Sequence, residues 1–419
     1  MSNKKIKILT LSDHPLLPSG VGTQTRYVIE ALLKSDKFQV LSLGGAVKHT
    51  DFTPQKVHED WVIIPVDGYG TQEQVTQHIN HFKPDILYFM TDPRFYEWLW
   101  VMEDSIRPQI PLVYYHVWDN YPFPQFNRGY YESNDFIATI SKVTSDIVQN
   151  VAPNVKERYI PHAVNSNIFS KITDNQIKDL REKVIPGKEF VCFWNNRNAR
   201  RKQSGTLVKW WKDFLDQDHI DESKVSLIMH TNLSDPHGQP LHHLAELFEL
   251  NKEHPQQIVF STEKVMPEQL AGFYNIADCT INIADAEGFG LATLESLSCE
   301  TPIIVTMTGG LQEQVTDGEN WFGIGLEPAS KALIGSQQVP YIYEDRVSQE
   351  DFLEALNKMY AMSSDERKTL GQKGREHVEK NYNFEDFNNT WVSTMEEIYE
   401  TMGSWENRKG YQSWKMEII

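Results

Sequence analysis

The apolar residues of the chain gather in short runs, and between these runs they return at the three- and four-residue spacing of amphipathic helices. Short apolar runs are typical of buried strands, and we predict strands at 5–11, 38–43, 61–65, 86–89, 112–115, 136–141, 190–194, 225–230, 279–284 and 303–306. Helical spacing is found at 23–34, 142–150, 291–299, 349–362, 364–381 and 384–402. Strands that alternate with helices predict parallel sheets covered by helices on both faces. The pattern therefore indicates an α/β protein of the doubly wound type.

Polar segments divide this pattern into domains. We predict a first Rossmann-like domain at 1–170, a linker at 171–188, a second Rossmann-like domain at 189–380 and a C-terminal helix within 381–419. The linker is predicted from its polar composition and its Pro-Gly ending. The stretch 322–346 is expected to be a long irregular loop, and a loop of that length inside a compact domain is usually functional.

Two glycine turns stand at equivalent places in the second domain. The first runs through Gly288, Phe289, Gly290 and Leu291, after the strand at 279–284 and into a helix; the second, Gly309-Gly310, follows the strand at 303–306. A helix N-terminus offers unpaired N–H groups and a partial positive charge. Glycine lets the backbone come close to an anion. Two such turns side by side would hold a diphosphate.

Two carboxylates flank the first glycine turn. Glu287 precedes the helix, and Glu295 lies about two turns inside it. A carboxylate is a poor partner for phosphate but accepts hydrogen bonds from neighbouring hydroxyl groups. We therefore expect Glu287 and Glu295 to bind the sugars at the two ends of a nucleoside diphosphate sugar. The alternative is that these glutamates and glycines only end helices.

This stretch resembles the E-x7-E signature of retaining glycosyltransferases with the GT-B fold, in particular the family 4 group. The matching positions are Glu287, Gly288, Phe289, Gly290, Leu291, Leu294, Glu295, Pro302, Gly309, Gly310 and Glu313, and the pattern is broken at Glu300 and Trp321. The resemblance implies two Rossmann-like doubly wound domains that face a central cleft. It implies that the second domain binds the nucleotide and that the first supplies most of the acceptor site. It also implies that the last helix packs back on the first domain.

The resemblance further assigns the diphosphate contacts to a basic turn after the strand at 190–194. In the family an arginine and a lysine five positions later bind the diphosphate, and Arg197 and Lys202 have that spacing. As the bond to the anomeric carbon breaks, negative charge grows on the leaving phosphate, and fixed cations stabilise that charge. Gln203 stands where the family has glycine. A solvated basic turn is the alternative interpretation.

Three residues of the first domain are implied to contact the donor sugar. Gly20 and Gly22 lie in the loop that in GT-B enzymes faces the donor sugar and the acceptor, although a plain tight turn would also use them. His116 follows the strand at 112–115, where family 4 members often carry a histidine that contacts the transferred sugar. A purely structural histidine is the alternative. The aromatic loop 121–126 is interpreted either as an acceptor platform or as a packed surface loop.

The sequence predicts neither a metal site nor a cofactor. The pair Asp216 and Asp218 falls in a helix-end segment rather than at the glycine turns, so we interpret it as surface. Arg197, Lys202 and the helix N-termini are expected to neutralise the diphosphate of the donor substrate, a UDP-sugar. The histidines at 237–243 have no spacing that suits a metal.

Composition bears on the compartment and the partners. The chain has 419 residues, a net charge of −18 and three cysteines at wide spacing. That cysteine usage favours a reducing compartment over a disulfide framework or a zinc site. No apolar run approaches a membrane span or the core of a signal peptide, so we expect a cytoplasmic protein without stable membrane insertion. The acidic balance disfavours non-specific binding to nucleic acid or anionic membranes.

The acceptor stays open at this point. The segments LSDHPLLPSGVGTQTRY and LEPASKALIGSQQVPYIYEDRV resemble glycosyltransferases of large tailed phages. In that setting a hydroxylated or hydroxymethylated cytosine in DNA would be an acceptor, and a glycan or a small molecule are the alternatives. Arg128, Arg200 and Arg201 could contact an anionic acceptor.

Two other functions compete with glycosyl transfer. One is a nucleotide-sugar epimerase or hydrolase on the same fold, which would need catalytic acids in the first domain, where Asp13 and Asp119 are the candidates. The other is a catalytically silent protein that binds a nucleotide or a carbohydrate. The complete charged set of Arg197, Lys202 and the two glutamates argues against the silent protein.

Overall fold

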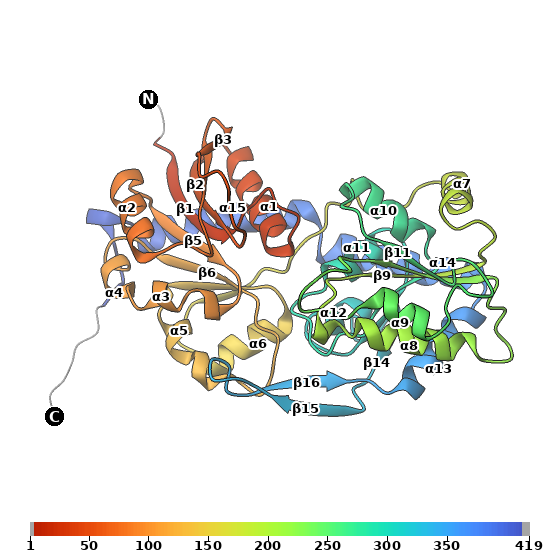
Figure 1. Ribbon diagram of the computed structural model, residues 1–419. Coiled ribbons are helices and arrows are strands. Elements are labelled where there is room, and N and C mark those ends of the chain that lie inside the picture. The colour runs from red at the N-terminus through yellow and green to blue at the C-terminus, as the bar shows by residue number, and fades with distance from the viewer. Residues whose placement is uncertain (1–3, 413–419) are drawn as a thin grey trace. The chain divides into compact units, whose positions relative to one another are not determined.

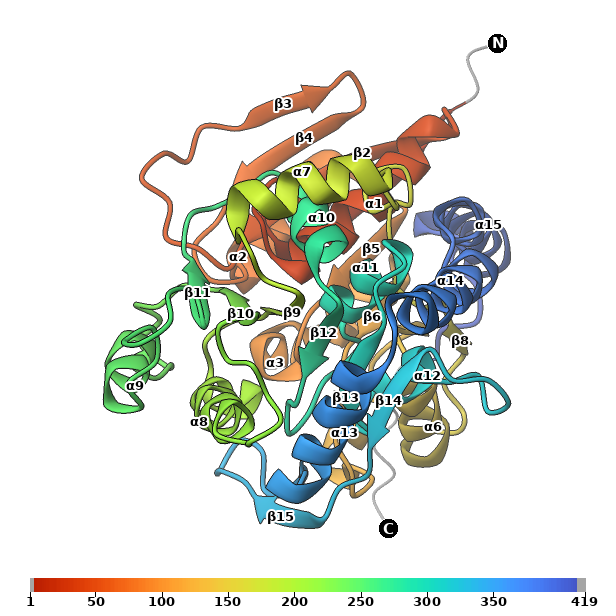
Figure 2. The same ribbon diagram turned by 90° about the vertical axis from the view of Figure 1, so that its right-hand side faces the viewer.

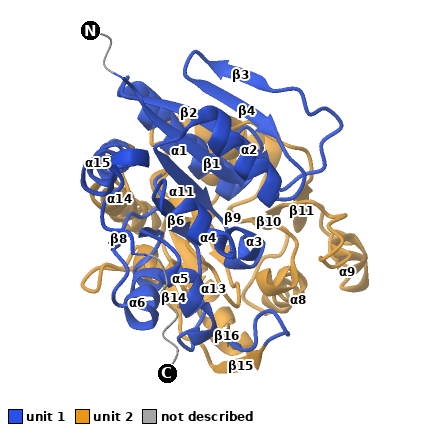
Figure 3. Cartoon of the chain, turned by 90° about the vertical axis from the view of Figure 1, so that its left-hand side faces the viewer, with its two compact units in different colours: residues 1–163, 335–342, 385–419 blue, residues 164–334, 343–384 orange. Residues whose placement is uncertain are grey.

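The computed structural model describes residues 4–412, which form two compact α/β units (Figure 1). Unit 1 contains residues 4–163, 335–342 and 385–412. Unit 2 contains Val164–Ile334 and Tyr343–Phe384 (Figure 3). Each unit is built on its own sheet, which is parallel throughout in unit 2 and parallel except for the β3–β4 edge pair in unit 1. The predicted α/β class with two sheet domains is therefore confirmed.

Unit 1 has an eight-stranded sheet in the order β3-β4-β2-β1-β5-β6-β7-β8. The strands are β1 (Ile6–Asp13), β2 (Phe38–Gly45), β3 (Gln55–His58), β4 (Trp61–Pro65), β5 (Ile86–Met90), β6 (Leu112–His116), β7 (Phe136–Thr139) and β8 (Glu157–Tyr159). All neighbouring pairs are parallel except β3 and β4. β5 and β6 are buried along their whole length, as continuous apolar runs predict for strands covered on both faces.

The α-helices of unit 1 are α1 (Gly20–Lys34), α2 (Gln72–Phe82), α3 (Glu97–Trp100), α4 (Glu103–Ile106), α5 (Arg128–Glu132), α6 (Lys142–Val151) and α15 (Phe384–Met402), with short 3-10 turns at Pro93–Phe95, Gln125–Asn127 and Trp405–Asn407. Most of α15 belongs to this unit, because the unit resumes at Glu385. Trp391 of α15 is fully buried and its ring meets those of Tyr88 and Tyr115 from the sheet. The last helix is thus part of the core of unit 1.

Unit 2 has a six-stranded parallel sheet in the order β11-β10-β9-β12-β13-β14. Its strands are β9 (Phe190–Asn195), β10 (Val225–His230), β11 (Ile258–Ser261), β12 (Cys279–Asn282), β13 (Ile303–Thr306) and β14 (Gly323–Leu326). Its helices are α7 (Asp174–Val184), α8 (Ser204–Leu215), α9 (Leu241–Leu247), α10 (Pro267–Ile276), α11 (Leu291–Ser298), α12 (Leu311–Val315), α13 (Gln349–Ala361) and α14 (Ser364–Asn381), with a 3-10 turn at Arg200–Lys202. Figure 2 shows α7 beside α10 and α11 beside α14.

Two segments differ from their predicted structure. The stretch 171–188, expected to be a linker, contains α7, and unit 1 gives way to unit 2 already after Ala163. None of the residues of α7 is fully buried. Ile177, Leu180 and Val184 have helical spacing but are only half-buried, and the polar residues that surround them led to the linker interpretation. The stretch 322–346 is not irregular: it forms β14 and the two-stranded ribbon of β15 (Ser330–Ile334) and β16 (Ile342–Arg346).

Helix α1 begins three residues earlier than predicted. Ser19 is its N-cap and accepts a hydrogen bond from the backbone N–H of Gly22, which is the usual role of serine at that position. Gly20 and Gly22 are therefore part of the first turn of the helix rather than of a preceding loop. Within residues 4–412, no helix is both long enough and apolar enough to cross a lipid bilayer.

Candidate functional site

The charged and glycine-rich segments of unit 2 meet at one edge of its sheet. β9, β12 and β13 are neighbouring parallel strands, so their carboxyl ends lie at the same edge. The loop after β9 carries the basic turn 197–202, the loop after β12 carries Glu287 and the first glycine turn, and the loop after β13 carries the second. In open α/β sheets, ligands bind at this edge.

Lys202 and Glu287 form an ion pair at the centre of this edge. Their side chains are only 7% and 13% exposed, and Asn282 Nδ2 lies 3.3 Å from the same carboxylate oxygen, Oε2. Burial acts to raise the pKa of Glu287, but the nearby charges of Lys202 and Arg201 outweigh it and lower the pKa. Glu287 is therefore held in its ionised form. The structure brings together these two predicted site residues, although they are far apart in the sequence.

Arg197 stands at the other end of the basic turn and has a different partner. Its Nε and Nη2 lie 2.5 and 3.1 Å from the two carboxylate oxygens of Asp235. The Arg197 side chain remains 61% exposed. The guanidinium is thus oriented by Asp235 while most of its surface stays in contact with solvent, so it remains open to a second anion.

A network that the sequence did not reveal holds the loop before Glu287. Asp285 accepts hydrogen bonds from Gln203 Nε2 at 2.7 Å and pairs with Arg346 Nη1 at 3.3 Å. Glu344, almost fully buried, binds both Arg200 and Arg346. Burial raises the pKa of Asp285 to about 6. Strand β16 supplies Glu344 and Arg346. The β15–β16 ribbon, which was expected to be an irregular loop, therefore stabilises the loop before Glu287.

Backbone contacts fix the same loop. The N–H of Asp285 donates to the carbonyl of Arg201 at 2.8 Å, and the N–H of Asp345 donates to the carbonyl of Asp285 at 2.9 Å. Arg201 also donates to the carbonyl of Ala286. Arg200 and Arg201, which could have contacted an anionic acceptor, are thus engaged within unit 2. They hold the basic turn against the loop that ends in Glu287.

The two glycine turns pack directly on each other. Gly290 has φ +93°, a left-handed conformation that other residues adopt only under strain. A Cβ added to Gly310 would lie 2.6 Å from the Cα of Phe289. The N–H of Gly310 donates to the carbonyl of Glu287 at 3.1 Å. Gly290 is therefore required by its backbone conformation, and Gly310 by the backbone atoms that leave no space for a side chain.

Glu295 lies on α11, and its environment differs from that of Glu287. Tyr274 Oη donates a hydrogen bond to Glu295 Oε2 at 2.7 Å. Burial raises the pKa of Glu295 to about 7, against the opposing effect of the Tyr274 hydrogen bond. No cation within the described chain pairs with this carboxylate. The two glutamates that flank the first glycine turn thus differ: Glu287 is held ionised by Lys202, whereas burial raises the pKa of Glu295 to about 7.

The remaining predicted site residues, Gly20, Gly22 and His116, belong to unit 1. His116 ends β6 and is fully buried. Its Nε2 lies 2.7 Å from Tyr131 Oη, and its Nδ1 has no hydrogen-bond partner in the described chain. Burial lowers the pKa of His116 to about 3, so the imidazole is neutral at physiological pH. Contact of these three residues with a donor sugar stays a prediction.

Burial of neutral His116 predicts a pH-dependent stability. The unfolded chain takes up a proton as the pH falls through the ordinary histidine pKa near 6.5, whereas folded His116 stays neutral down to about 3. Between those values folding loses about 1.4 kcal/mol per pH unit for this group. We expect the difference in melting temperature between pH 7 and pH 5 to be smaller in His116→Gln than in the parent protein. The variant His81→Gln, which changes an exposed histidine, is the control, and its melting temperature should change with pH as that of the parent does. An equal fall in melting temperature from pH 7 to pH 5 in the parent and in both variants would contradict the assignment.

The aromatic loop that follows β6 packs against unit 1. The rings of Trp118 and Phe126 lie 5.8 Å apart, and those of Tyr121 and Phe123 lie 5.4 Å apart. These rings border the hydrophobic core of the unit. Asp13, a candidate acid for the epimerase or hydrolase alternative, accepts hydrogen bonds from Ser19 Oγ at 2.7 Å and from Tyr69 Oη at 2.9 Å. Asp13 is thereby used to fix the loop that precedes α1.

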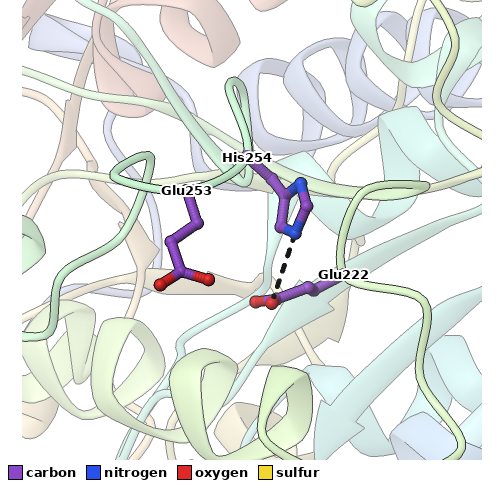
Figure 4. A group of neighbouring side chains, drawn as sticks. All are labelled: Glu222, Glu253 and His254. Carbon is purple, nitrogen blue, oxygen red and sulfur yellow. Dashed lines mark ion pairs between the residues drawn. The ribbon is translucent and has the colours of Figure 1, made fainter.

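One group of side chains among the described residues lies close enough together to hold a metal ion. It consists of Glu222, Glu253 and His254, whose ligand atoms lie within 4.8 Å of one another (Figure 4). Glu222 precedes β10 and His254 precedes β11, so the group lies at the amino edge of the unit 2 sheet. The Lys202–Glu287 pair lies at the opposite, carboxyl edge. This group therefore cannot act as a metal clamp on a phosphate bound beside Lys202.

Comparison with known proteins identifies the type of domain. Residues 175–377, which contain the whole carboxyl-edge site of unit 2, match the family model described as "Glycosyl transferases group 1". The alpha-monoglucosyldiacylglycerol synthase of Streptococcus pneumoniae is 26% identical over 193 residues, which are 45% of this chain and 41% of that protein. The chain thus aligns with less than half the length of this relative. The matched region is a glycosyltransferase family domain.

Solved structures resemble the chain over nearly its whole length. Sucrose-phosphate synthase from Thermosynechococcus elongatus superimposes with a TM-score of 0.75 at 17% sequence identity. The alignment covers 94% of this chain and 100% of the synthase chain. HepE from Anabaena, solved in complex with UDP-glucose, has a TM-score of 0.69 at 16% identity and likewise covers 94% and 100%. At such low identity the likeness concerns the fold. The fold of the chain is that of the GT-B glycosyltransferases, as the sequence predicted.

Proposed function

We propose that the chain is a retaining glycosyltransferase that moves a sugar from a UDP-sugar to a hydroxyl acceptor, acting through the glycosyltransferase domain at 175–377. The observation that carries the proposal is the buried Lys202–Glu287 ion pair beside the packed glycine turns, at the carboxyl edge of the unit 2 sheet. The UDP-glucose complex of a protein with this fold supports the choice of donor.

The diphosphate of the donor is assigned to the cationic side of this edge. Lys202 and Arg197 are each oriented by a carboxylate, and Arg197 keeps most of its side chain in solvent. Charge builds on the departing phosphate as the glycosidic bond breaks, so cations fixed before the reaction lower the barrier. Prior orientation means that little further ordering is needed when the donor binds.

The two carboxylates are assigned to the two carbohydrate ends of the donor. Glu287, held ionised by Lys202, accepts hydrogen bonds from hydroxyl groups of the transferred sugar. Glu295, with a pKa of about 7, accepts them from the ribose hydroxyls. Both roles follow from the chemistry of an ionised carboxylate, which only accepts hydrogen bonds, beside vicinal hydroxyls; for Glu295 this form predominates above about pH 7.

Transfer on the retaining course proceeds by attack on the same face of the anomeric carbon. The bond from that carbon to the phosphate oxygen breaks, and a bond to the acceptor oxygen forms. The acceptor's proton passes to the leaving phosphate, so the protein need not supply a general base. Its contribution is then to hold the donor and to stabilise the charge on the phosphate.

The acceptor is proposed only as a class, a hydroxyl group. A glycan, a small molecule and a hydroxylated or hydroxymethylated base in phage DNA are the candidates. The net charge of −18 opposes DNA, and Arg201 is already engaged by Ala286, whereas Arg200, paired with Glu344, keeps 61% of its side chain exposed. If DNA is the acceptor, its binding should weaken steeply with salt, because each phosphate contact releases counterions.

A donor-by-acceptor screen read by mass spectrometry tests the proposal. UDP-sugars are incubated with the protein in EDTA, with glycans, small polyols or hydroxymethylated duplex DNA, and also with no acceptor. A mass increase of one sugar on any acceptor, with release of UDP, is the expected result. Sugar release only as free monosaccharide would identify a hydrolase, and a changed sugar still joined to UDP would identify an epimerase. UDP binding without any reaction would contradict the assignment.

A further inference from the structure

A chain of hydrogen bonds leads from the end of β9 to the second glutamate of the site. Asn195 Nδ2 donates to Tyr274 Oη at 2.9 Å, and Tyr274 Oη donates to Glu295 Oε2 at 2.7 Å. Asn195 is the last residue of β9, Tyr274 lies on α10 and Glu295 on α11. Three separate elements of unit 2 thus converge on one carboxylate.

We propose that Tyr274 is a positioning residue for the nucleotide, which fixes Glu295 so that its second oxygen, Oε1, receives the ribose hydroxyls. The inference rests on the proposed function, because it takes the ligand of Glu295 to be the ribose of a nucleoside diphosphate sugar. It adds a residue that does not touch the ligand itself.

The directions of the hydrogen bonds support this role. Asn195 occupies an acceptor position of the Tyr274 hydroxyl, so the single proton of that hydroxyl is directed to Glu295. Within the described chain, Oε2 of Glu295 has this donor and Oε1 has none. Glu295 is half-buried rather than enclosed. One oxygen is therefore held by the protein and the other is left for a ligand.

Packing prevents the tyrosine from moving. Its side chain is fully buried, and its ring lies 5.0 Å from that of Phe193 and 6.1 Å from that of Phe169, edge to face in both cases. An edge-to-face aromatic cluster of this kind is a rigid support. The hydroxyl is consequently presented to Glu295 from a fixed point, and the carboxylate is oriented before the nucleotide arrives.

The hydrogen bond also affects ionisation. The titratable groups that face Glu295 are the Tyr274 hydroxyl and the buried thiol of Cys299, whose pKa is also raised by burial. Since the tyrosine hydrogen bond lowers the pKa of Glu295, removing the hydroxyl moves that pKa above about 7. A larger fraction of Glu295 is then protonated at neutral pH, and a protonated carboxyl is a weaker acceptor for two neighbouring hydroxyls.

Calorimetric titration of Tyr274→Phe with two probes tests the inference. The probes are UDP and 2′,3′-dideoxy-UDP, which lacks the hydroxyls that Glu295 would bind. At pH 7 we expect Tyr274→Phe to bind UDP roughly tenfold more weakly than the parent, because a displaced and more protonated Glu295 loses a hydrogen bond that it would make to the ribose hydroxyls. Its affinity for the dideoxy probe should be unchanged, and its deficit for UDP should shrink at pH 9.

Tyr360→Phe is the matched control. Tyr360 lies on α13 in the same unit and packs its ring on Phe190 and Phe214, so the variant loses a hydroxyl away from the site and should bind both probes normally. Equally weakened binding of both probes by Tyr274→Phe would show a merely structural role, and unchanged binding would show that the residue is dispensable. Either result overturns this inference but leaves the proposed function standing. If the parent protein binds no UDP, the proposed function fails with it.

Discussion

Replacing Lys202 with alanine is expected to lower kcat by about 10²–10³-fold, the effect of removing one fixed group that stabilises a developing anion. The reason is the position of Lys202: its side chain is 7% exposed and its ammonium is held by Glu287 at the carboxyl edge of the sheet. A mobile surface lysine could be replaced by solvent, but a buried and oriented one cannot. The measurement is the steady-state rate of UDP release with the acceptor found in the screen.

The same substitution should also destabilise unit 2, and this separates the two roles of the lysine. Without Lys202, Glu287 becomes a largely buried carboxylate without its ion pair, a loss of about 3–5 kcal/mol in comparable cases. The double variant Lys202→Ala, Glu287→Gln removes the uncompensated charge. We expect it to regain much of the melting temperature and none of the rate. A double variant that regained both would show that Lys202 acts only through stability.

Replacing Gly310 with alanine is expected to impair both stability and UDP binding. The added Cβ would lie 2.6 Å from Phe289 Cα, 2.7 Å from the carbonyl oxygen of Phe289 and 2.8 Å from that of Gly288. All three atoms belong to the backbone, so the first glycine turn must move to relieve the overlap. Overpacking of this kind costs about 1–3 kcal/mol. Thermal unfolding and UDP titration measure the two effects.

Gly129→Ala is the control for this variant. Gly129 lies in α5, and a Cβ there would meet no atom within 4 Å. Alanine stabilises such a position by roughly 0.4–1 kcal/mol, because it restricts the unfolded chain. We expect Gly129→Ala to melt at or slightly above the temperature of the parent and to bind UDP normally. Normal UDP binding by Gly310→Ala would contradict the location of the diphosphate at the glycine turns.

The elements that could be predicted are those with a strong local signal. β10 and β13 follow continuous apolar runs and are buried along all or nearly all of their length. Helix α14 has the predicted limits, with Ser363 and Glu366 forming a capping box at its start. The two strands are recognisable because both of their faces are covered, so that nearly every residue is apolar. The helix is recognisable because its capping box marks where it begins.

The elements that were missed bury little. Neither β15 nor α7 has a fully buried residue, although Ile177, Leu180 and Val184 of α7 form a half-buried apolar stripe. A local signal did exist for α7: Thr173 and Gln176 have the spacing of a capping box, which the structure confirms. For β15 and β16 there was no such signal, because a two-stranded ribbon at the surface depends on pairing rather than on burial.

The candidate site divides in the same way. Glu287 could be singled out because it stands beside a glycine turn, and Lys202 because its spacing from Arg197 resembles that of the family's diphosphate-binding pair. Asp285, Glu344 and Arg346 could not, because Arg346 is brought to Asp285 only by the packing of β16 against the loop after β12. Tyr274 was missed since an aromatic residue on an amphipathic helix is normally a core residue. Its hydroxyl acquires a role only through the partners that the fold supplies.

The most direct test of the central claim is a crystal structure of the protein soaked with UDP. We predict the diphosphate within hydrogen-bonding distance of Lys202 Nζ and of the backbone N–H groups of the Gly288–Leu291 turn, with the ribose hydroxyls on Glu295 Oε1. UDP bound elsewhere, or bound with these groups directed away from it, would contradict the account.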